Sequence, residues 1–302
     1  AVVPLVASSA AGDYKLPDLV SVAPPVNSAY LIEGTFTSQP GEEGAAGRLL
    51  LRFDGYVDNV GDGPLHFQGN PQDRSVTQWA QSATGGAPKA LPAADAIPSP
   101  GTDPLNNNAE GMDACVGVPA APPARPGAGP CIIYSSTDSE RASDGHNHWH
   151  LVGAARYTLW NATGAAQVAP GQKVGFCLYD YARIPGMQSG EQFYGYKGGT
   201  DNFCQQYNRG ATSLIEGINP GFRDVYESRL AWQWIDVSNV QPGQYRLGNE
   251  ADPFNRIWEK NESNPIARST GTVAIPGWVP ATPGTVSTPA GTPVAVTLPA
   301  TK

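Results

Sequence analysis

The chain has 302 residues, of which 35 are Gly and 29 are Pro, and its net charge is −8. Gly and Pro interrupt helices, so this composition excludes a long helical bundle or a coiled coil. The 19 Lys and Arg residues form no basic patch for nucleic acid, and no apolar run is long enough to span a membrane as a helix. Because 40% of the residues are hydrophobic, we expect a sizeable core in one all-β, sandwich-like domain with long irregular loops and few helices.

Turn signals divide the first half of the chain. Residues 1–15 show no clear period and are expected to form an N-terminal arm, which is followed by an extended segment at residues 16–20. Residues 47–59 are rich in β-formers and predict a strand. Further strands are predicted on both sides of a turn within residues 146–160, and at residues 172–180, 233–237 and 244–247.

Two segments are dominated by small residues. Residues 81–131 are crowded with Ala, Pro, Gly and Asn, and they predict a long surface loop with little regular structure. Cys115 and Cys131 bracket the last part of this loop, and a disulfide between them would close it. Residues 271–302 are rich in Thr, Pro, Val and Ala, and predict either an edge strand or a linker. The main domain is therefore expected to span residues 16–270.

The cysteine content favours a secreted protein. The chain has 4 Cys, an even number, few Lys, and a start at Ala1 without Met. Disulfides persist in oxidising compartments, so we expect an extracellular, mature chain whose leader has been removed. The acidic net charge favours cationic partners through a mild field effect.

Three of the 4 histidines fall within five residues, as His146, His148 and His150. On a strand, alternate side chains share a face, so the three imidazoles lie together while Trp149 and Leu151 face the core. Three neutral imidazoles with open positions form a site that suits Cu(II) or Zn(II), and ligand softness does not separate the two metals. A surface histidine tract or a tag is the alternative, but a tag would be terminal and would not alternate.

An open metal site of this kind is more typical of catalysis than of a structural role, because structural zinc sites are closed by a fourth protein ligand. His66 is the remaining histidine and could supply that ligand. Its turn-like surroundings at residues 61–66 disfavour this assignment.

Five segments together resemble the catalytic domain of the lysyl oxidase family, the copper- and quinone-dependent amine oxidases. The order and spacing of these segments agree with the family from about residue 16 to about residue 265. The segments are LPDLV at 16–20, LLLRF at 49–53, the three-histidine strand, GQKVGFCLYD at 171–180, and NPGFRDVYESRLAWQWIDVSNVQPGQYRL at 219–247.

The resemblance implies that the three clustered histidines bind copper, and that Lys173 and Tyr226 are cross-linked into lysine tyrosylquinone, which serves as an electron sink. It implies oxidative deamination of primary amines, either peptidyl lysine or small amines, to aldehydes. O₂ would be consumed, and ammonia and hydrogen peroxide released. Asp224, two residues before Tyr226, is a candidate general base, and a loop Asp bonded to backbone is the alternative.

The sequence departs from the family pattern at several cysteines. Gly145 stands where the family has Cys before the first motif histidine. Phe222 and Trp232 stand where the family has a Cys pair, so apolar packing is expected there. The resemblance pairs Cys177 with Cys204. Residues 81–131 are an insertion that could form a wall of the substrate approach, so the family's substrate specificity does not carry over.

The resemblance also implies a calcium site that joins the two ends of the domain. Hard oxygen ligands of the expected kind suit Ca²⁺. Asn261 replaces a family Asp and Pro265 replaces a family Asn, which weakens the site, and an exposed polar turn is the alternative. The matching positions are Asp18, Leu19 through its carbonyl, Glu259, Asn261 and Asn264.

Two other functions remain open from the sequence. The chain could be a secreted copper- or zinc-binding β-domain without a quinone, acting as a binding or structural module. It could also be a copper oxygenase of another kind. The presence of Lys173 and Tyr226 argues against the module.

Overall fold

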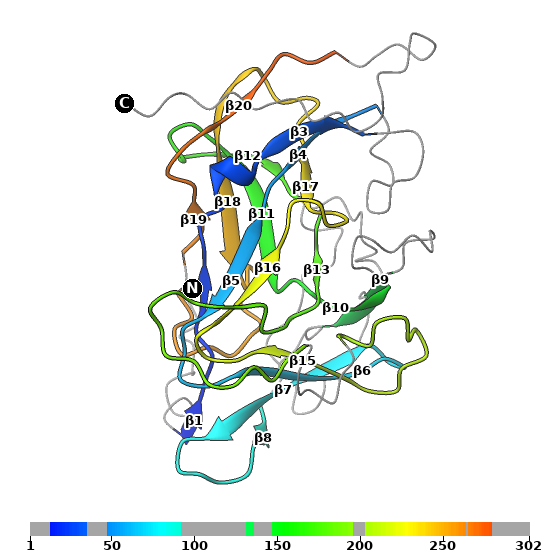
Figure 1. Cartoon of the computed structure of the whole chain (residues 1–302), viewed down its shortest axis with the longest axis vertical. Coiled ribbons are helices and arrows are strands. Elements are labelled where there is room, and N and C mark those ends of the chain that lie inside the picture. Colours follow the sequence, from blue (N-terminus) through cyan, green and yellow to red (C-terminus); the bar gives the residue numbers. More distant parts are fainter. Residues whose placement is uncertain are drawn as a thin grey trace, which may run out of the picture.

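A computed structural model describes residues 13–34, 47–91, 131–135, 147–195, 203–263 and 265–279. These residues are built from strands and loops with a short 3₁₀ turn at Val26–Ser28, so the predicted all-β class is confirmed. None of the described residues forms a helix that is long and apolar enough to cross a membrane. Figure 1 shows strands β5, β11, β16 and β18 along the middle of the molecule, with β6, β7 and β15 crossing below them.

The strands within the described ranges form five sheets, in which every pairing is antiparallel. Two of these sheets have five strands. One contains β1 (Tyr14–Lys15), β7 (Ser75–Ser82), β6 (Leu65–Asn70) and β15 (Leu214–Ile218), with β8 (Lys89–Ala90) on β7. The other contains β12 (Gln167–Pro170), β11 (Ala155–Asn161), β18 (Gly243–Ala251) and β19 (Ala267–Arg268), with β20 (Val273–Ile275) on β18.

Three smaller sheets complete the described architecture. The four-stranded sheet has the order β14 (Ala182–Arg183), β16 (Phe222–Tyr226), β5 (Gly55–Asn59) and β2 (Leu19–Ser21). One three-stranded sheet consists of β13 (Gly175–Phe176), β10 (His148–Val152) and β9 (Ile132–Ser135). The other consists of β17 (Trp234–Asp236), β4 (Leu49–Arg52) and β3 (Tyr30–Glu33).

Several expected strands have different bounds in the structure. Residues 47–59 form two strands, β4 and β5, because the chain leaves one sheet after Arg52 and joins another at Gly55. Only Gly175–Phe176 is strand within residues 172–180. The predicted loop at 81–131 begins with the end of β7 and contains β8, and its residues 92–130 lie outside the described ranges.

Short segments just outside the predicted domain, at residues 14–15 and 273–275, join its sheets where the structure describes them. Tyr14 and Lys15 pair with β7, and Val273–Ile275 pairs as an added strand with β18. At residues 273–275 the edge-strand alternative therefore holds. The domain boundaries at residues 15 and 270 remain a prediction.

A run of aromatic rings fills the core between the central strands. The ring centroids of Phe53 and Tyr157 are 5.7 Å apart, those of Tyr157 and Phe176 are 6.0 Å apart, and those of Phe176 and Tyr226 are 4.9 Å apart. Gly55 permits this packing, since a Cβ atom there would lie 2.3 Å from the Tyr157 hydroxyl. The run leads directly to the candidate active site.

Candidate active site

Strand β10 brings two of the clustered histidines to one buried position. His148 and His150 point to the same side of the strand, and their Nε2 atoms lie 2.7 Å apart. Trp149 points to the other side, where its ring packs edge-on against Tyr134 with centroids 5.5 Å apart. His146 lies outside the described residues. The predicted alternation is therefore confirmed for the two described histidines.

The histidine pair is enclosed: only 5% of His148 and 1% of His150 are exposed. Both faces of β10 are covered, since every residue from His148 to Val152 is buried. Burial lowers the pKa of both imidazoles well below its ordinary value, and the charge of Lys173 lowers it further. Both rings are therefore neutral near pH 7, which is the form that coordinates a metal.

A disulfide fixes the segment that covers these histidines. Cys177 and Cys204 are bonded, as the resemblance implied, with their Cα atoms 5.9 Å apart. The carbonyl of Cys204 accepts a hydrogen bond from the Trp149 N–H at 2.9 Å, and the adjacent Phe203 ring packs 5.4 Å from the His148 ring. The disulfide thus anchors Phe203 over the imidazole pair.

The second predicted disulfide is described at one end. Cys131 is disulfide-bonded and buried beside β7, where it forms an isolated bridge with Ser75. Cys115, its expected partner, lies outside the described residues.

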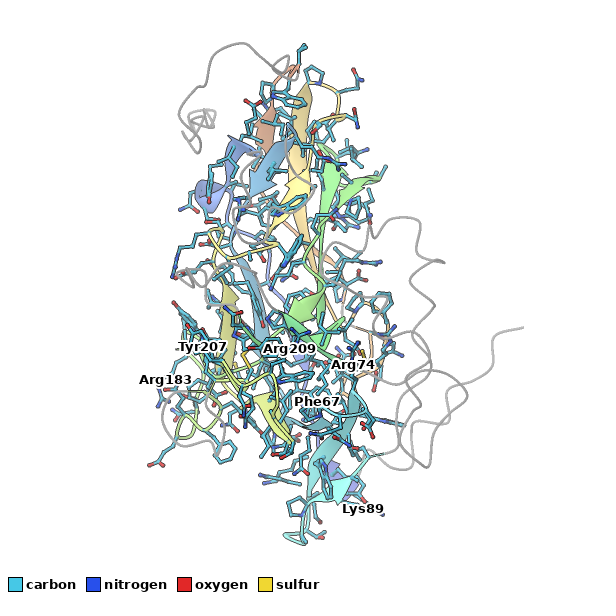
Figure 2. The ribbon with its side chains drawn as sticks, turned by 90° about the vertical axis from the view of Figure 1, so that its right-hand side faces the viewer. Phe67, Arg74, Lys89, Arg183, Tyr207 and Arg209 are labelled. Atoms are coloured by element: carbon cyan, nitrogen blue, oxygen red, sulfur yellow. A yellow bond between two sulfur atoms is a disulfide. The ribbon has the colours of Figure 1, made fainter. Side chains whose placement is uncertain are left out.

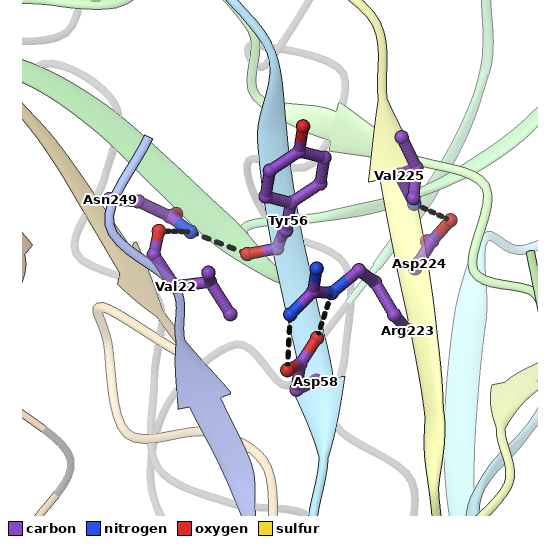
Figure 3. A network of polar contacts seen from close by, with 7 residues as sticks. All are labelled: Val22, Tyr56, Asp58, Arg223, Asp224, Val225 and Asn249. Atoms are coloured by element: carbon purple, nitrogen blue, oxygen red, sulfur yellow. Dashed lines mark hydrogen bonds and ion pairs between the residues drawn. The ribbon is translucent and has the colours of Figure 1, made fainter. Parts of the chain in front are cut away.

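Strand β16 points Asp224 and Tyr226 to its buried side. Asp224 is fully buried, and 4% of Tyr226 is exposed. Arg223 points the other way and donates two hydrogen bonds to the carboxylate of Asp58 on the neighbouring strand β5, at 2.6 and 2.8 Å. Figure 3 shows this ion pair and the Val225 N–H that donates to Asp224. In the RDVY segment, Arg223 therefore forms an ion pair on one face of β16, whereas the candidate catalytic groups Asp224 and Tyr226 lie on the buried face.

A short polar line connects Asp224, Tyr226 and the disulfide segment. The Tyr226 hydroxyl lies 2.5 Å from the Asp224 carboxylate and 3.1 Å from the Cys177 carbonyl oxygen. Burial raises the pKa of Asp224 to about 8, although the bonds from Tyr226 and Val225 oppose this rise. Burial and the charge of Asp224 also raise the pKa of Tyr226 well above its ordinary value. Asp224 is placed to hold or release a proton at the Tyr226 hydroxyl.

Lys173 approaches the ring of Tyr226 from a different part of the chain. Its side chain is buried, and Nζ lies 5.2 Å from the Tyr226 ring centroid and 5.3 Å from the Phe176 ring centroid. Backbone bonds hold the flanking segment, from Gln172 N–H to the Trp234 carbonyl and from the Gly153 N–H to the Val174 carbonyl. The structure therefore places together the two residues that the resemblance pairs in a cofactor.

Some neighbours of this pair were not identified from the sequence. Phe176 packs edge-on against Tyr226 and contacts Lys173, and its place in the GQKVGFC segment was the available signal. Tyr157 lies close enough to Asp224 and Tyr226 to influence their charges. Glu216 binds the Leu178 N–H at 3.2 Å. Tyr157 and Glu216 lie on distant strands, and no spacing in the sequence links them to Tyr226.

The two cysteine replacements at Phe222 and Trp232 are both buried. They do not replace the lost disulfide by packing on each other. Phe222 belongs to the main core with Tyr226, and Trp232 packs in a separate cluster with Ile32 and Leu50.

Two ends of the chain meet at the predicted calcium ligands. The Glu259 carboxylate accepts a hydrogen bond from the Leu19 N–H, which lies 240 positions earlier in the sequence. Burial raises the pKa of Glu259 to about 9, and the charges of Asp252, Glu262 and Asp18 add to this rise. Several carboxylates therefore share one region of low solvent access.

Two other predicted calcium ligands are Asn261 and Asn264. Asn261 accepts the Ser263 N–H with its side-chain oxygen at 3.2 Å, and Asn264 lies outside the described residues. Within the described ranges, no group of three or more His, Cys, Asp or Glu side chains is arranged to hold a metal ion. The predicted copper and calcium sets each have a member beyond those ranges.

His66 has another environment from the one its sequence context indicated. It lies on strand β6 and not in a turn, and its ring nitrogens contact the Tyr194 hydroxyl at 2.7 Å and the Gln68 amide at 3.2 Å. Both ring nitrogens of His66 thus contact groups other than the clustered histidines.

Part of the chain is similar to known proteins. The family model for lysyl oxidase matches residues 135–273. Protein-lysine 6-oxidase from Gallus gallus is 33% identical over 125 residues, which are 41% of this chain and 25% of that protein. The Sus scrofa protein of the same name is 31% identical over 125 residues, covering 41% of this chain and 43% of that protein.

Lysyl oxidase homolog 1 from Homo sapiens is 30% identical over 124 residues, covering 41% of this chain and 18% of that protein. The matched region thus spans less than half the length of each of these relatives. It contains β10, Lys173 and β16, and therefore the candidate active site.

Proposed function

Residues 135–273 belong to the lysyl oxidase family, an amine oxidase family, and from this premise we propose that the protein oxidises primary amines with Cu(II) and a quinone made from Lys173 and Tyr226. The products would be an aldehyde, ammonia and hydrogen peroxide, with O₂ and water consumed. The observation that carries the proposal is the Lys173 amine 5.2 Å from the Tyr226 ring centroid.

The residues present fit a copper ion. His148 and His150 direct their Nε2 atoms to within 2.7 Å of each other, and burial keeps both rings neutral. Imidazole nitrogen suits Cu(II), and a third imidazole from His146 would complete the predicted set. Zinc fits the same ligands, so the choice of copper rests on the redox chemistry that the proposal requires.

The residues present also fit a cofactor derived from Lys173 and Tyr226. Both side chains are buried, and the Phe176 ring lies near both, so the amine and the ring share a site of low solvent access. When formed, the quinone would supply a carbonyl for the amine substrate and a store for two electrons. Asp224, at the Tyr226 hydroxyl, is positioned to accept the proton that the substrate carbon loses.

The substrate class in this proposal is a primary amine, either peptidyl lysine or a small amine. The net charge of −8 favours cationic amines by long-range attraction. The buried Cys177–Cys204 disulfide supports a secreted protein, since such bonds persist in oxidising compartments.

Copper-loaded protein exposed to O₂ is expected to release peroxide when a primary amine such as benzylamine or cadaverine is added. Zinc-loaded protein is expected to release none, because zinc has no redox chemistry to convert the tyrosine. The measurement is a coupled peroxide assay on protein of known metal content. Equal peroxide release from the copper and zinc forms, or none from either, would contradict the proposal, and the second result would favour a metal-binding module without a quinone.

We also propose a calcium ion at the Asp18, Leu19 and Glu259 region, where it would join the two ends of the domain. Calcium is expected to raise the melting temperature of the wild-type protein by about 2–4 °C for each kcal/mol of binding free energy. In Glu259→Gln this increase is expected to disappear, because a charged ligand is lost.

In calcium-free buffer the effect of Glu259→Gln should have the opposite sign. The variant is expected to melt above the wild type, because the buried carboxyl, with its pKa of about 9, no longer costs stability at neutral pH. Differential scanning calorimetry with and without calcium measures both effects, and Glu191→Gln on an exposed loop is the control. A calcium response retained in full by Glu259→Gln would refute the site.

A further inference from the structure

A groove of about 650 Å³ lies on the outer face of strands β6 and β7, separate from the candidate active site. Side chains alternate along β6: Leu65 and Phe67 are buried in the core, whereas His66 and Gln68 face outward. Figure 2 shows Phe67 within the body of the molecule and Lys89, on the adjoining β8, near its lower end. The volume is that of a typical ligand-binding site.

The floor of the groove offers no backbone groups to a ligand. Strand β6 pairs with β7 on one side and with β15 on the other, so its N–H and C=O groups are used within the sheet. A peptide that binds by adding a strand needs an unpaired edge. Recognition at the floor of the groove must therefore come from side chains.

The charges of the lining exclude a polyanion. Glu191 is an acidic residue of the lining, and neither Lys nor Arg is among the described residues that form it. Burial lowers the pKa of His66, so its ring adds no positive charge at neutral pH. Nucleic acids and sulfated polymers require cationic side chains, which this groove does not offer.

The remaining lining combines amide side chains with aromatic rings. Amides can donate and accept at once, which matches vicinal hydroxyl groups. Aromatic rings provide flat faces for the C–H groups of a sugar ring, and Trp and Tyr add a polar tip. The lining includes Gln68, Gln81, Gln192 and Asn219 together with Trp79, Phe193 and Tyr194. We propose that this groove binds a neutral oligosaccharide.

One wall of the groove is fixed by the buried carboxylate of Asp180. It accepts hydrogen bonds from the N–H groups of Phe193 and Tyr194 at 2.9 and 3.2 Å. It also accepts the Asn219 N–H at 2.7 Å and the Asn219 side-chain amide at 2.9 Å. Two lining segments that are distant in sequence are thus held by one residue, which lowers the entropic cost of binding a ligand.

Close packing holds Tyr194 in place beside this wall. A Cβ atom at Gly217 would lie 2.6 Å from the Tyr194 ring, so the absence of a side chain there lets the ring reach His66. Trp79, on the neighbouring strand, has a buried Nε1 atom with no hydrogen-bond partner among the described residues.

The test is a titration of the full chain with three neutral probes: cellohexaose, maltohexaose and chitohexaose. Tryptophan fluorescence and isothermal calorimetry are expected to show binding of at least one probe with a Kd in the millimolar range or tighter. Trp79→Ala and Gln68→Ala are each expected to weaken this binding about tenfold or more. Gln241→Ala, on an exposed turn after β17, is the matched control and should bind as the wild type does.

Two further probes test the excluded classes. Heparin hexasaccharide and an extended decapeptide rich in Thr and Val are expected not to bind at the same concentrations. The proposal is overturned if none of the neutral sugars binds the folded wild type, if Gln68→Ala and Trp79→Ala bind as tightly as Gln241→Ala, or if heparin or the peptide binds more tightly than the sugars. Because the groove lies outside the catalytic centre, amine oxidation by Gln68→Ala should equal that of the wild type, so this proposal can fail independently of the proposed function.

Discussion

Tyr226→Phe is expected to reduce amine-dependent peroxide release by the copper-loaded protein to the level of a protein-free control. The variant keeps the buried ring that packs 4.9 Å from Phe176 but lacks the hydroxyl that Asp224 contacts. Without a phenol there is no group that copper and O₂ can convert to a quinone. The fold should persist, since only one oxygen atom is removed and the core packing of the ring is unchanged.

Lys173→Met is the companion variant for the other half of the proposed cofactor. Methionine fills similar volume in the buried site but has no amine to add to the ring. Its peroxide release is also expected to fall to background, while its melting temperature stays near that of the copper-free wild type, because methionine fills the buried site without adding an unpaired polar group. Tyr181→Phe is a control, since this tyrosine is exposed and its hydroxyl bonds to Glu227 at 3.1 Å.

Mass spectrometry separates a missing cofactor from a damaged site. Digestion of copper-loaded wild-type protein is expected to yield one peptide that joins the Lys173 and Tyr226 segments, and both variants should yield only separate peptides. Full activity in Tyr226→Phe or Lys173→Met, or unlinked peptides from an active wild-type sample, would overturn the assignment of the quinone to these two residues.

The parts of the site that the sequence predicts are those set by local alternation. The pattern HNHWH places His148 and His150 on one side of β10, and RDVY places Asp224 and Tyr226 on one side of β16. A period of two determines these relations within a few residues. The burial of the histidine pair was not predicted, because its surroundings include segments distant in sequence, such as Phe203, which packs on His148 beside the Cys177–Cys204 disulfide.

Contacts between distant segments could not be predicted from the local pattern of residues in the sequence. Lys173 and Tyr226 meet because Phe176 of β13 packs against the Tyr226 ring and Lys173 lies near both rings, and no periodicity connects residues 173 and 226. The resemblance to a family supplied this pair. The resemblance did not indicate the role of Asp180. The buried carboxylate of this residue holds one wall of the groove on strands β6 and β7.

The division of residues 47–59 shows another limit of local pattern. The segment is rich in β-formers, so it predicts one strand. In the structure, Leu50 pairs with β3 and β17, whereas Val57 pairs with β2 and β16. The change of sheet near Phe53 and Asp54 is determined by which strands pair with each half, and these partners come from both ends of the chain.

The role of Asp224 can be tested through the pH dependence of activity. Burial raises its pKa to about 8, so most molecules carry a protonated carboxyl at pH 7. A general base must be ionised, and therefore kcat/KM of the wild type is expected to rise with pH through about 8. The carboxyl loses its proton only near pH 8 because burial stabilises the neutral acid relative to the charged carboxylate.

Asp224→Asn is expected to lower kcat/KM by about 10²- to 10⁴-fold, the usual contribution of a general base, and to remove the rising limb of the profile. The amide oxygen can still accept the hydrogen bond from the Val225 N–H, and the amide nitrogen can donate to the Tyr226 hydroxyl oxygen while that hydroxyl donates to the Cys177 carbonyl, so the strand and the position of the ring should be kept. A purely structural role predicts a different result, in which activity falls with the melting temperature and the profile keeps its rise near pH 8. An unchanged profile in an active Asp224→Asn protein would therefore assign the proton transfer to another group, and the carboxylate of Asp224 would remain only as the residue that orients Tyr226.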